Sequence, residues 1–308
     1  MKICVVGSGA VGGWYAGLLA EAGHEVHCIS RTDFTVINDR GLILRDTQGE
    51  RTVKVASARP NANDIGQCDL IVVAAKTTAN PSIEPLIKPL IGAQTILLTL
   101  QNGMGNVEVF TAFIPSKRVV AGLCFVCINR TAPGVISNTM RGYVKMAAAV
   151  GESNPAVDLC VKIFRDAGVE CDSEPSLNSV LWKKLCWNIP FNGLAIAAGG
   201  ITTDLILNNP ELLQRSHKLM EEVREAARLC GAPFSQNHID KQFAVTAGMG
   251  AYRPSSLIDY LEGRDVEVDA LWGIPHQRGT AAGAKMPELN KLKDEIQAKL
   301  SARNTKRS

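Results

Sequence analysis

Three polar side chains recur at helical spacing in an otherwise apolar segment, and their types are suited to chemistry. Lys184, Asn188 and Asn192 stand at positions i, i+4 and i+8, so a helix stacks them on one face. Neighbours such as Trp187 and Phe191 are apolar, which predicts a largely buried helix. A buried amide without a partner costs about 1–3 kcal/mol, and a lone buried cation costs more. This face is therefore expected to bind a polar group.

The N-terminus indicates a second kind of chemistry, phosphate binding. An apolar run over residues 2–6 ends at Gly7, a helical pattern follows, and a second apolar run covers 25–29. Between them lies G-x-G-x-x-G, in which Gly7 makes a turn, Gly9 lets the backbone approach a pyrophosphate, and Gly12 lets helix and strand pack closely. The amides at the start of the helix suit phosphates. The residues predicted to hold a dinucleotide are Gly7, Ser8, Gly9, Ala10, Val11 and Gly12.

The residue after the second strand indicates which dinucleotide is bound. An NAD site places Asp or Glu there, to accept a hydrogen bond from the ribose 2′-hydroxyl. This chain has Ser30-Arg31-Thr32 instead. Arg31 can pair with a 2′-phosphate and stack on adenine, whereas a carboxylate would repel the phosphate. NADP(H) is therefore favoured, and the alternative is a surface arginine without a role.

Two more predicted strands, over residues 69–74 and 95–100, are each followed by a polar residue. Ligands of open α/β sheets gather at the carboxyl ends of strands, so Lys76 is a candidate contact to the cofactor. Asn102 is a candidate amide at the nicotinamide end. The alternatives are a solvated loop lysine for Lys76 and, because Asn-Gly favours turns, a turn residue for Asn102.

The order of elements predicts an α/β fold with two domains. Residues 1–173 are expected to form an NADP-binding Rossmann-type domain with a doubly wound parallel sheet, and residues 174–308 a helical domain for substrate and catalysis. A hairpin is expected from 42–45 and 51–56, a helix over 82–91, and short β runs over 119–150 with turns at 132–134 and 141–142. A helix over 155–167 and a strand over 169–172 close the first domain. Helices are then expected over 175–198, 210–230, 237–247, 255–262, 266–278 and 287–302, with a frayed basic tail.

Composition excludes several classes of protein. The 308 residues are 46% apolar and 20% charged, and a net charge of +3 is too small to indicate nucleic acid. Nine cysteines scattered in apolar segments suit reduced thiols in the cytoplasm. Cys124 and Cys127 lack a second pair to complete a zinc site, so no metal is expected. No signal peptide and no apolar run of about 18 residues is found, so no membrane association is expected either.

Three motifs, in this order, resemble the ketopantoate reductase (2-dehydropantoate 2-reductase) family, NADPH-dependent enzymes of pantothenate synthesis. They are Gln101-Asn-Gly-Met-Gly105, Leu181-Trp-Lys-Lys-Leu185 with Asn188 and Asn192, and Pro254-Ser-Ser-Leu-Ile-Asp-Tyr-Leu-Glu-Gly-Arg264 leading to Glu267. The resemblance spans essentially the whole chain. It implies Lys184 and Glu267 as catalytic residues and Asn102, Asn188, Asn192 and Ser255 as substrate-binding residues. Arg31 and Lys76 match the family's NADPH-binding positions, and Ser256 is the less favoured serine.

Two departures from the family pattern concern the substrate and leave the chemistry in place. Pro190 precedes Asn192, which continues as Gly-Leu-Ala-Ile, and Gly199-Gly-Ile-Thr-Thr203 lacks an asparagine that some members use. The implied reaction is hydride transfer from NADPH to the C2 carbonyl of a 2-oxo acid. Lys184 would act as general acid, Asn102 as oxyanion donor, and Glu267 as acceptor for a substrate hydroxyl.

Each of these residues has a structural alternative. Lys184 can be a snorkelling helix lysine, Glu267 a solvated helix residue, and Ser255 a helix N-cap. The two asparagines of the helix can be satisfied within the core by neighbouring backbone. For the whole protein, the rivals are a reductase of another 2-oxo or β-keto acid and a non-catalytic NADP(H) sensor. The apolar surfaces of the C-terminal helices leave room for a homodimer.

Overall fold

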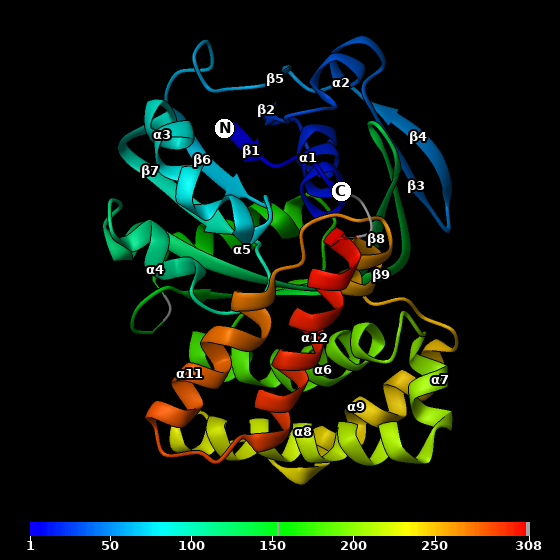
Figure 1. Cartoon of the computed structure of the whole chain (residues 1–308). Coiled ribbons are helices and arrows are strands. Elements are labelled where there is room, and N and C mark those ends of the chain that lie inside the picture. Colours follow the sequence, from blue (N-terminus) through cyan, green and yellow to red (C-terminus); the bar gives the residue numbers. More distant parts are fainter. Residues whose placement is uncertain (153, 306–308) are drawn as a thin grey trace. The chain divides into compact units, whose positions relative to one another are not determined.

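The computed structural model describes residues 1–152 and 154–305, and its contacts divide the chain into two compact units (Figure 1). The first unit contains Met1–Asn102 and Asn106–Leu177. The second contains Gly103–Gly105 and the chain from Asn178 onward. A three-residue segment from the middle of the chain therefore belongs to the C-terminal unit.

The first unit is built on one ten-stranded sheet of order β4-β3-β9-β8-β7-β6-β1-β2-β5, with β10 beside β9. Its strands are β1 (Lys2–Val6), β2 (Glu25–Ile29), β3 (Leu42–Asp46), β4 (Gly49–Val53), β5 (Ser57–Arg59), β6 (Cys68–Val73), β7 (Ile91–Thr99), β8 (Val119–Ala132), β9 (Val135–Ala148) and β10 (Cys171–Ser173). The run from β5 to β8 is parallel, whereas β8–β9 and β3–β4 pair antiparallel. The Rossmann-type α/β fold is confirmed, with a parallel-rich rather than a wholly parallel sheet.

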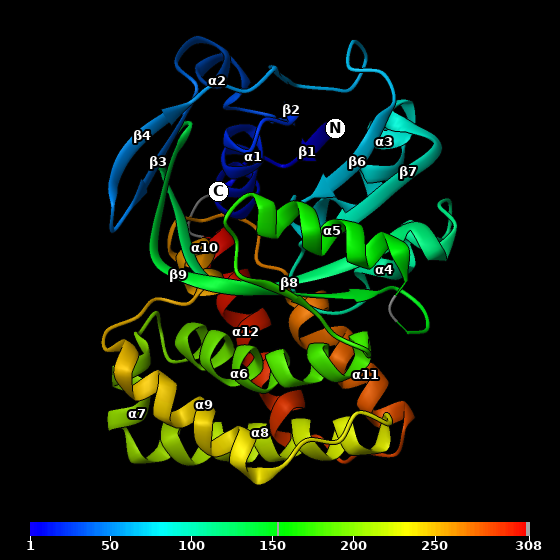
Figure 2. The same ribbon diagram turned by 180° about the vertical axis from the view of Figure 1, so that it is seen from behind.

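Helices cover both faces of this sheet, and the alternation of β1 shows why. Ile3 and Val5 belong to one core, whereas Cys4 and Val6 belong to the other. Successive side chains of a strand point to opposite faces, so a strand buried on both sides is apolar throughout. Helices α1 (Ala10–Glu21) and α5 (Pro155–Asp166) pack on one face, and α5, which contacts β8 and β9, is drawn above β8 in Figure 2. Helices α3 (Ile83–Ile87) and α4 (Asn106–Thr111) pack on the other, and α2 (Phe34–Arg40) follows β2.

Local predictions in the first unit were correct for the hairpin β3–β4 and the turn at 132–134, and wrong in two places. The predicted helix over 82–91 is broken into 3₁₀ turns, η1 (Thr77–Ser82) and η2 (Lys88–Leu90), around the short α3. Prolines at 81, 85 and 89 lack the N–H that a continuous helix needs. The predicted turn at 141–142 lies inside β9, where irregular register against β8 accommodates Gly142. A further 3₁₀ turn, η3 (Ser116–Arg118), precedes β8.

The regular elements of the second unit are all helices among the residues that the structure describes. Its elements are α6 (Leu177–Ala197), α7 (Thr203–Asn208), α8 (Pro210–Leu229), α9 (Gln236–Met249), α10 (Ser255–Leu261), the π-turn η4 (Asp269–Gly273), α11 (Ile274–Ala281) and α12 (Pro287–Thr305). Its core is built around fully buried Trp182, Phe191 and Trp272. The predicted all-α architecture is confirmed.

Two local features of the second unit differ from the predictions. Helix α7 was not predicted, whereas the helix predicted over 266–278 is present as η4 followed directly by α11, and therefore begins with a π-turn. Residues 299–305 of the predicted frayed tail are helical, because α12 continues to Thr305, and residues 306–308 lie outside the described residues. Within α12, Arg303 Nη1 donates to the carbonyl oxygens of Tyr260 and Arg264, each at 3.1 Å.

Two further observations concern the class of protein. Among residues 1–152 and 154–305, no helix combines the length and apolarity needed to cross a membrane. None of the nine cysteines, all within those ranges, is part of a disulfide, and all but Cys230 are buried.

Candidate active site

The glycine turn of the first unit is fixed by close backbone packing. Gly7 has φ +92°, and a Cβ there would lie 2.4 Å from the Ala75 nitrogen. A Cβ on Gly12 would lie 2.1 Å from the Gly7 carbonyl oxygen. A Cβ on Gly9 would meet nothing within 4 Å, so the middle glycine borders open space. The turn therefore leaves room beside its backbone at the position where a pyrophosphate is expected.

The start of α1 matches that space electrostatically. Its N-cap is Gly9, which has no side chain to cap the first-turn amides, and the first turn carries no acidic residue. Uncapped amides at a helix N-terminus attract anions. Ser8 is buried, and Ala10 and Val11 are half-buried around the same turn. A dinucleotide phosphate fits this environment.

The carboxyl ends of neighbouring strands lie at the same edge of the sheet. The amide of Gly7 donates to Ile29 O at 2.9 Å, that of Ala74 to Val6 O at 2.9 Å, and that of Leu100 to Val73 O at 2.8 Å. These bonds connect the ends of β1, β2, β6 and β7. The predicted cofactor residues Arg31, Lys76 and Asn102 each follow one of these strands, so the structure gathers them with the glycine turn at one edge. Lys76 and Asn102 are half-buried.

A network of amide side chains, absent from the sequence predictions, supports the segment around Asn102. Gln101 Nε2 donates to Ala75 O at 2.9 Å and to Asn80 Oδ1 at 2.7 Å. Asn106 Nδ2 donates to Asn102 O at 3.0 Å, and Asn80 Nδ2 donates to Asn106 Oδ1 at 3.3 Å. The only sequence signal was the position of Gln101 inside a family motif. These side chains hold the backbone of Asn102.

The segment after β2 carries an acidic residue whose carboxylate is bound by an arginine of β8. Asp33 is buried, and its two carboxylate oxygens accept from Arg130 Nη1 at 2.9 and 2.8 Å. The Gly134 amide donates to the same carboxylate at 3.1 Å. Burial alone would raise the pKa of Asp33, but hydrogen bonds from Thr32, Gly134 and Arg130 lower it overall. Asp33 is therefore an ionised tether between β2 and β8.

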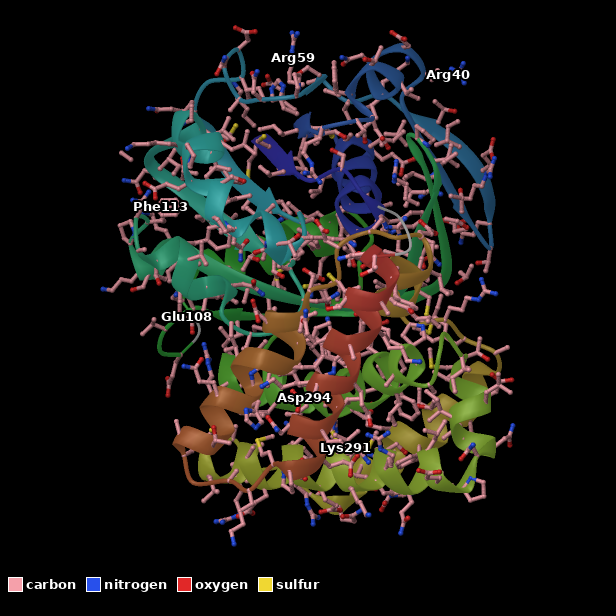
Figure 3. All side chains as sticks on the ribbon, viewed as in Figure 1. Arg40, Arg59, Glu108, Phe113, Lys291 and Asp294 are labelled. Carbon is pink, nitrogen blue, oxygen red and sulfur yellow. The ribbon has the colours of Figure 1, made fainter. Side chains whose placement is uncertain are left out.

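Two arginines lie at this strand end, and one of them was not predicted. Arg31 is exposed, two residues beyond β2. The pairing of β2 with β5 places Arg59 opposite Ile29, and the Ser30 amide donates to Arg59 O at 2.9 Å. Arg59 and Arg40, labelled in Figure 3, are both exposed. Arg59 could not have been found from the sequence, because β5 was not predicted.

In the second unit, the stagger of α6 separates its two lysines. Lys183 lies toward α9, because its carbonyl oxygen accepts from His238 Nε2 at 3.0 Å and nearby Trp187 Nε1 donates to Thr246 Oγ1 at 2.8 Å. Lys184 stands one residue on, on the same face as Asn188 and Asn192. Lys184 and Asn188 are half-buried, and Asn192 is 2% exposed.

The buried Asn192 caps a neighbouring helix. Its Oδ1 accepts from the Ser256 amide at 3.0 Å, in the first turn of α10. The structural alternative, in which a backbone group satisfies the asparagine within the core, is therefore correct for the Asn192 oxygen. The N-cap of α10 is Pro254 and Ser255 is the first helical residue, so the N-cap alternative for Ser255 was wrong. Ser255 is exposed, whereas Ser256 is buried.

Glu267 lies two residues before the start of the π-turn η4. It is half-buried, and its carbonyl oxygen accepts from the Leu271 amide at 3.1 Å. Trp272 Nε1 donates to Ile189 O of α6 at 3.0 Å, which ties the turn to the helix that carries Lys184. Single π-turns inside helices are frequent at functional sites. Hydrogen bonds thus link α6 to α10 through Asn192 and α6 to η4 through Trp272.

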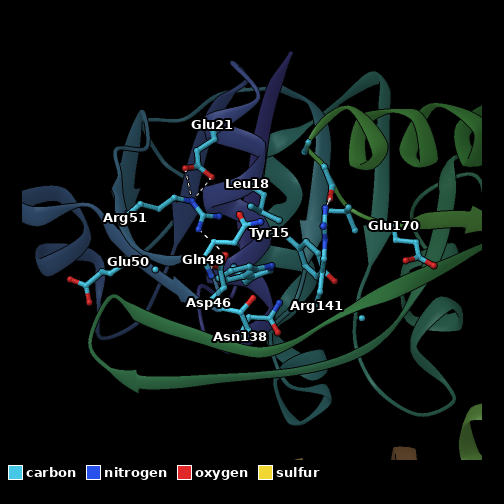
Figure 4. A pocket seen from close by; sticks show the side chains of 17 residues that line it. Tyr15, Leu18, Glu21, Asp46, Gln48, Glu50, Arg51, Asn138, Arg141 and Glu170 are labelled. Atoms are coloured by element: carbon cyan, nitrogen blue, oxygen red, sulfur yellow. Dashed lines mark hydrogen bonds and ion pairs between the residues drawn. The ribbon is translucent and has the colours of Figure 1, made fainter.

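The first unit also has a cleft of about 580 Å³ that is separate from the predicted site residues (Figure 4). It is lined by α1, the β3–β4 hairpin, β9 and the segment after α5, and none of the predicted site residues lines it. Arg51 in its wall pairs with Glu21 at 2.8 Å and with Asp46 at 2.9 Å. The described residues hold no group of three or more His, Cys, Asp or Glu side chains arranged for a metal ion.

A glycine turn that fits a dinucleotide, together with a helical unit bearing a lysine–asparagine face, defines a Rossmann-type oxidoreductase. Residues 3–151 match the family model described as ketopantoate reductase PanE/ApbA, and residues 176–300 match the model of that family's C-terminal part. The chain belongs to the ketopantoate reductase family.

Individual relatives agree with this assignment. The 2-dehydropantoate 2-reductase of Nostoc sp. is 33% identical over 296 residues, covering 94% of this chain and 92% of the relative. The crystal structure of 2-dehydropantoate 2-reductase from Geobacter metallireducens gives a TM-score of 0.93 at 33% identity, covering 97% of this chain and 99% of the other. D-mandelate dehydrogenase with NADH and anilino(oxo)acetate gives a TM-score of 0.90 at 20% identity, covering 99% of each chain, which shows a shared fold alone.

Proposed function

We propose that this oxidoreductase uses NADPH to reduce the C2 carbonyl of a 2-oxo acid, with 2-dehydropantoate (ketopantoate) as its substrate and pantoate as the product. The observation that carries the proposal is the half-buried Lys184 on the polar face of α6, in a chain whose other unit has a cradle for a dinucleotide. Relatives covering nearly the full chain bear the name 2-dehydropantoate 2-reductase. The substrate is taken from those relatives.

The proposed roles follow from charge development at the carbonyl oxygen. The reduced nicotinamide, when bound, supplies a hydride to the carbonyl carbon. Lys184 donates a proton to the oxygen as general acid. The Asn102 amide donates a hydrogen bond to the same oxygen, in an oxyanion-hole role. Lys184 then takes a proton from water to restore the ammonium group.

The remaining polar residues are assigned to the rest of the substrate. The exposed Ser255 hydroxyl and the Asn188 amide bind the carboxylate, and Glu267 accepts from the substrate hydroxyl. The Asn192 oxygen already accepts from Ser256, so toward a substrate we assign Asn192 the role of a donor through Nδ2. A carboxylate or carbonyl oxygen of the substrate can accept that hydrogen bond.

The preference for NADPH rests on the end of β2. Arg31 and Arg59 offer two exposed guanidinium groups there, and the carboxylate of Asp33 is engaged by Arg130. The region thus favours a 2′-phosphate over a ribose hydroxyl. In the wild type we expect NADPH to be preferred over NADH, and Arg31→Ala to remove most of that preference. Equal use of both cofactors by the wild type would contradict the assignment.

The decisive experiment is a substrate panel with purified protein and NADPH, followed by loss of absorbance at 340 nm (the reduced nicotinamide band). Ketopantoate should give the highest kcat/KM among 2-oxo acids that differ in side-chain size and in the hydroxyl expected to face Glu267. Turnover of a different 2-oxo or β-keto acid, without ketopantoate turnover, would establish the paralogous reductase instead. NADPH binding without turnover of any panel member would favour the sensor.

The proposed cellular setting is a reducing compartment. Eight buried thiols without a disulfide suit a reducing compartment such as the cytoplasm. A homodimer through the helical unit remains a prediction, which the molecular mass in solution would test.

A further inference from the structure

The segment Gly103–Gly105 belongs to the second unit, and a backbone hydrogen bond connects it to that unit. The Met104 amide donates to the carbonyl oxygen of Ala270 at 2.9 Å. Ala270 is part of the π-turn η4. Met104 itself is 1% exposed and packs in the helical core. The residues immediately after Asn102 are therefore held by the element that follows Glu267.

The Ala270 carbonyl is available because of the sequence of the turn. Within η4, the Ile274 amide donates to Asp269 O, five residues back. In the same register the next donor, for Ala270 O, would be residue 275. That residue is Pro275, which has no N–H. The π-turn and the proline together leave one helical carbonyl for a donor outside the helix, and Met104 supplies it.

Gly103 lets the two backbones come this close. It has φ +80°, and a Cβ there would lie 2.3 Å from Ala270 O and 2.5 Å from Ala270 C. Both contacts are with backbone, which cannot move aside as a flexible side chain can. Any other residue at this position would displace the loop from the turn.

Asn102 is thus held on both sides. Its own carbonyl oxygen accepts from Asn106 Nδ2 at 3.0 Å, and the chain after it is fixed by the Met104–Ala270 bond. We infer that Pro275 is a positioning residue for Asn102, because it reserves the Ala270 carbonyl for the Met104 amide. The assignment rests on the proposed function only in that Asn102 serves as an oxyanion donor, and a donor is effective only when it is aimed before the reaction.

The anchor itself can be tested without any assay of activity. Hydrogen exchange at single-residue resolution should show the Met104 amide strongly protected in the wild type. Pro275→Ala supplies a competing N–H inside the helix and should speed exchange of that amide by about 10-fold or more. Rapid exchange at Met104 in the wild type, or unchanged exchange in the variant, would overturn the inference even if the reductase reaction is established.

Kinetics then test whether the anchor positions Asn102. Pro275→Ala and Gly103→Ala should each lower kcat by about 10-fold or more, up to the 10²–10³-fold typical of a lost oxyanion donor. NADPH stoichiometry per chain should stay at the wild-type value, and KM should rise less than kcat falls. A loss explained by fewer NADPH-binding molecules, or wild-type kcat in Pro275→Ala, would contradict the positioning role.

Two matched controls separate positioning from general damage. Pro287→Ala removes a proline at the first residue of α12, where a helix amide has no intrahelical partner. Gly151→Ala adds a side chain at φ +77° with nothing within 4 Å, which reproduces the backbone strain of Gly103→Ala without its clash. Both controls should keep wild-type kcat and Met104 exchange. If Pro287→Ala lowers kcat as much as Pro275→Ala, or Gly151→Ala as much as Gly103→Ala, the loss of any proline or glycine explains the effect. The inference then fails.

Discussion

The glycine turn of the first unit and the polar face of α6 both carry candidate site residues, but their structures are determined in different ways. The turn is set by contacts among Gly7, Gly12 and Ala75, in which a single Cβ would collide with backbone. The face of α6 is set by partners far along the chain. Asn192 bonds a residue 64 positions away, and the Ile189 carbonyl is reached from 83 positions away.

This difference separates two kinds of functional region. The glycine turn has no room for added atoms where its backbone is packed, and it has open space where the cofactor is expected to bind. A side-chain face depends on which of its groups the surrounding helices already use. A substitution can therefore disrupt the glycine turn by adding side-chain volume. It can disrupt the polar face of α6 by removing a hydrogen-bond donor or acceptor.

The largest effect is expected on the face of α6. Lys184→Ala should lower kcat by at least about 100-fold, because the developing alkoxide loses its proton donor. Lys183→Ala is the matched control, since Lys183 lies toward α9, and it should stay within a few-fold of the wild type. Steady-state kinetics with ketopantoate and NADPH decide the point. Equal losses of kcat in both variants would mean that the position of a lysine on the helix does not decide which one is the general acid.

The second prediction contrasts two glycines of the turn. Gly9→Ala places a methyl group in open space, so the protein should fold normally but bind NADPH about 10-fold or more weakly. Gly12→Ala puts a Cβ 2.1 Å from the Gly7 oxygen and should lower the free energy of unfolding as well. Urea unfolding and NADPH titration measure the two effects. A Gly9→Ala variant with wild-type NADPH affinity would show that the open space is not the phosphate site.

The third prediction separates the two functions of the Asn192 amide. Asn192→Ala leaves the Ser256 N–H without its acceptor and should lower the free energy of unfolding by about 1–3 kcal/mol. Asn192→Asp keeps an acceptor at the start of α10, so stability should be largely retained while the Nδ2 donor is lost. Urea unfolding and KM for the 2-oxo acid distinguish the two. An Asp variant with wild-type KM would make Asn192 a cap alone.

The smallest expected effect is a pH dependence beside α6. Burial lowers the pKa of His238 below its ordinary 6.5, although its bond to Lys183 O acts in the opposite direction. The unfolded chain therefore takes up this proton at higher pH than the folded one. The stability that His238 contributes is complete above about pH 6.5 and decreases as pH falls through the folded pKa. His238→Gln should reduce the difference between urea midpoints at pH 7.5 and 5.5, and an unchanged difference would contradict it.

Local sequence was sufficient for features whose cause is local. The turn at Gly7–Gly12, the strand ends before Lys76 and Asn102, and the stack of Lys184, Asn188 and Asn192 follow from glycine sterics and helical period. Predictions failed where the cause was a cluster of prolines, as over 77–90, or a distant partner, as for Arg303 at the end of α12. The small strand β5, and with it Arg59, exists only because β2 offers an edge to pair with.

The sequence by itself determined the residue types available for chemistry, the dinucleotide turn and the two-part α/β and all-α order, because these depend on spacing over one or two turns of chain. Only the tertiary structure decided which groups are already used. It assigned the Asn192 oxygen to Ser256, the Asp33 carboxylate to Arg130, and the Ala270 carbonyl to Met104. The physical reason is that a buried polar group must find a partner, and which partner reaches it is fixed by packing between segments that the chain brings together only when it folds.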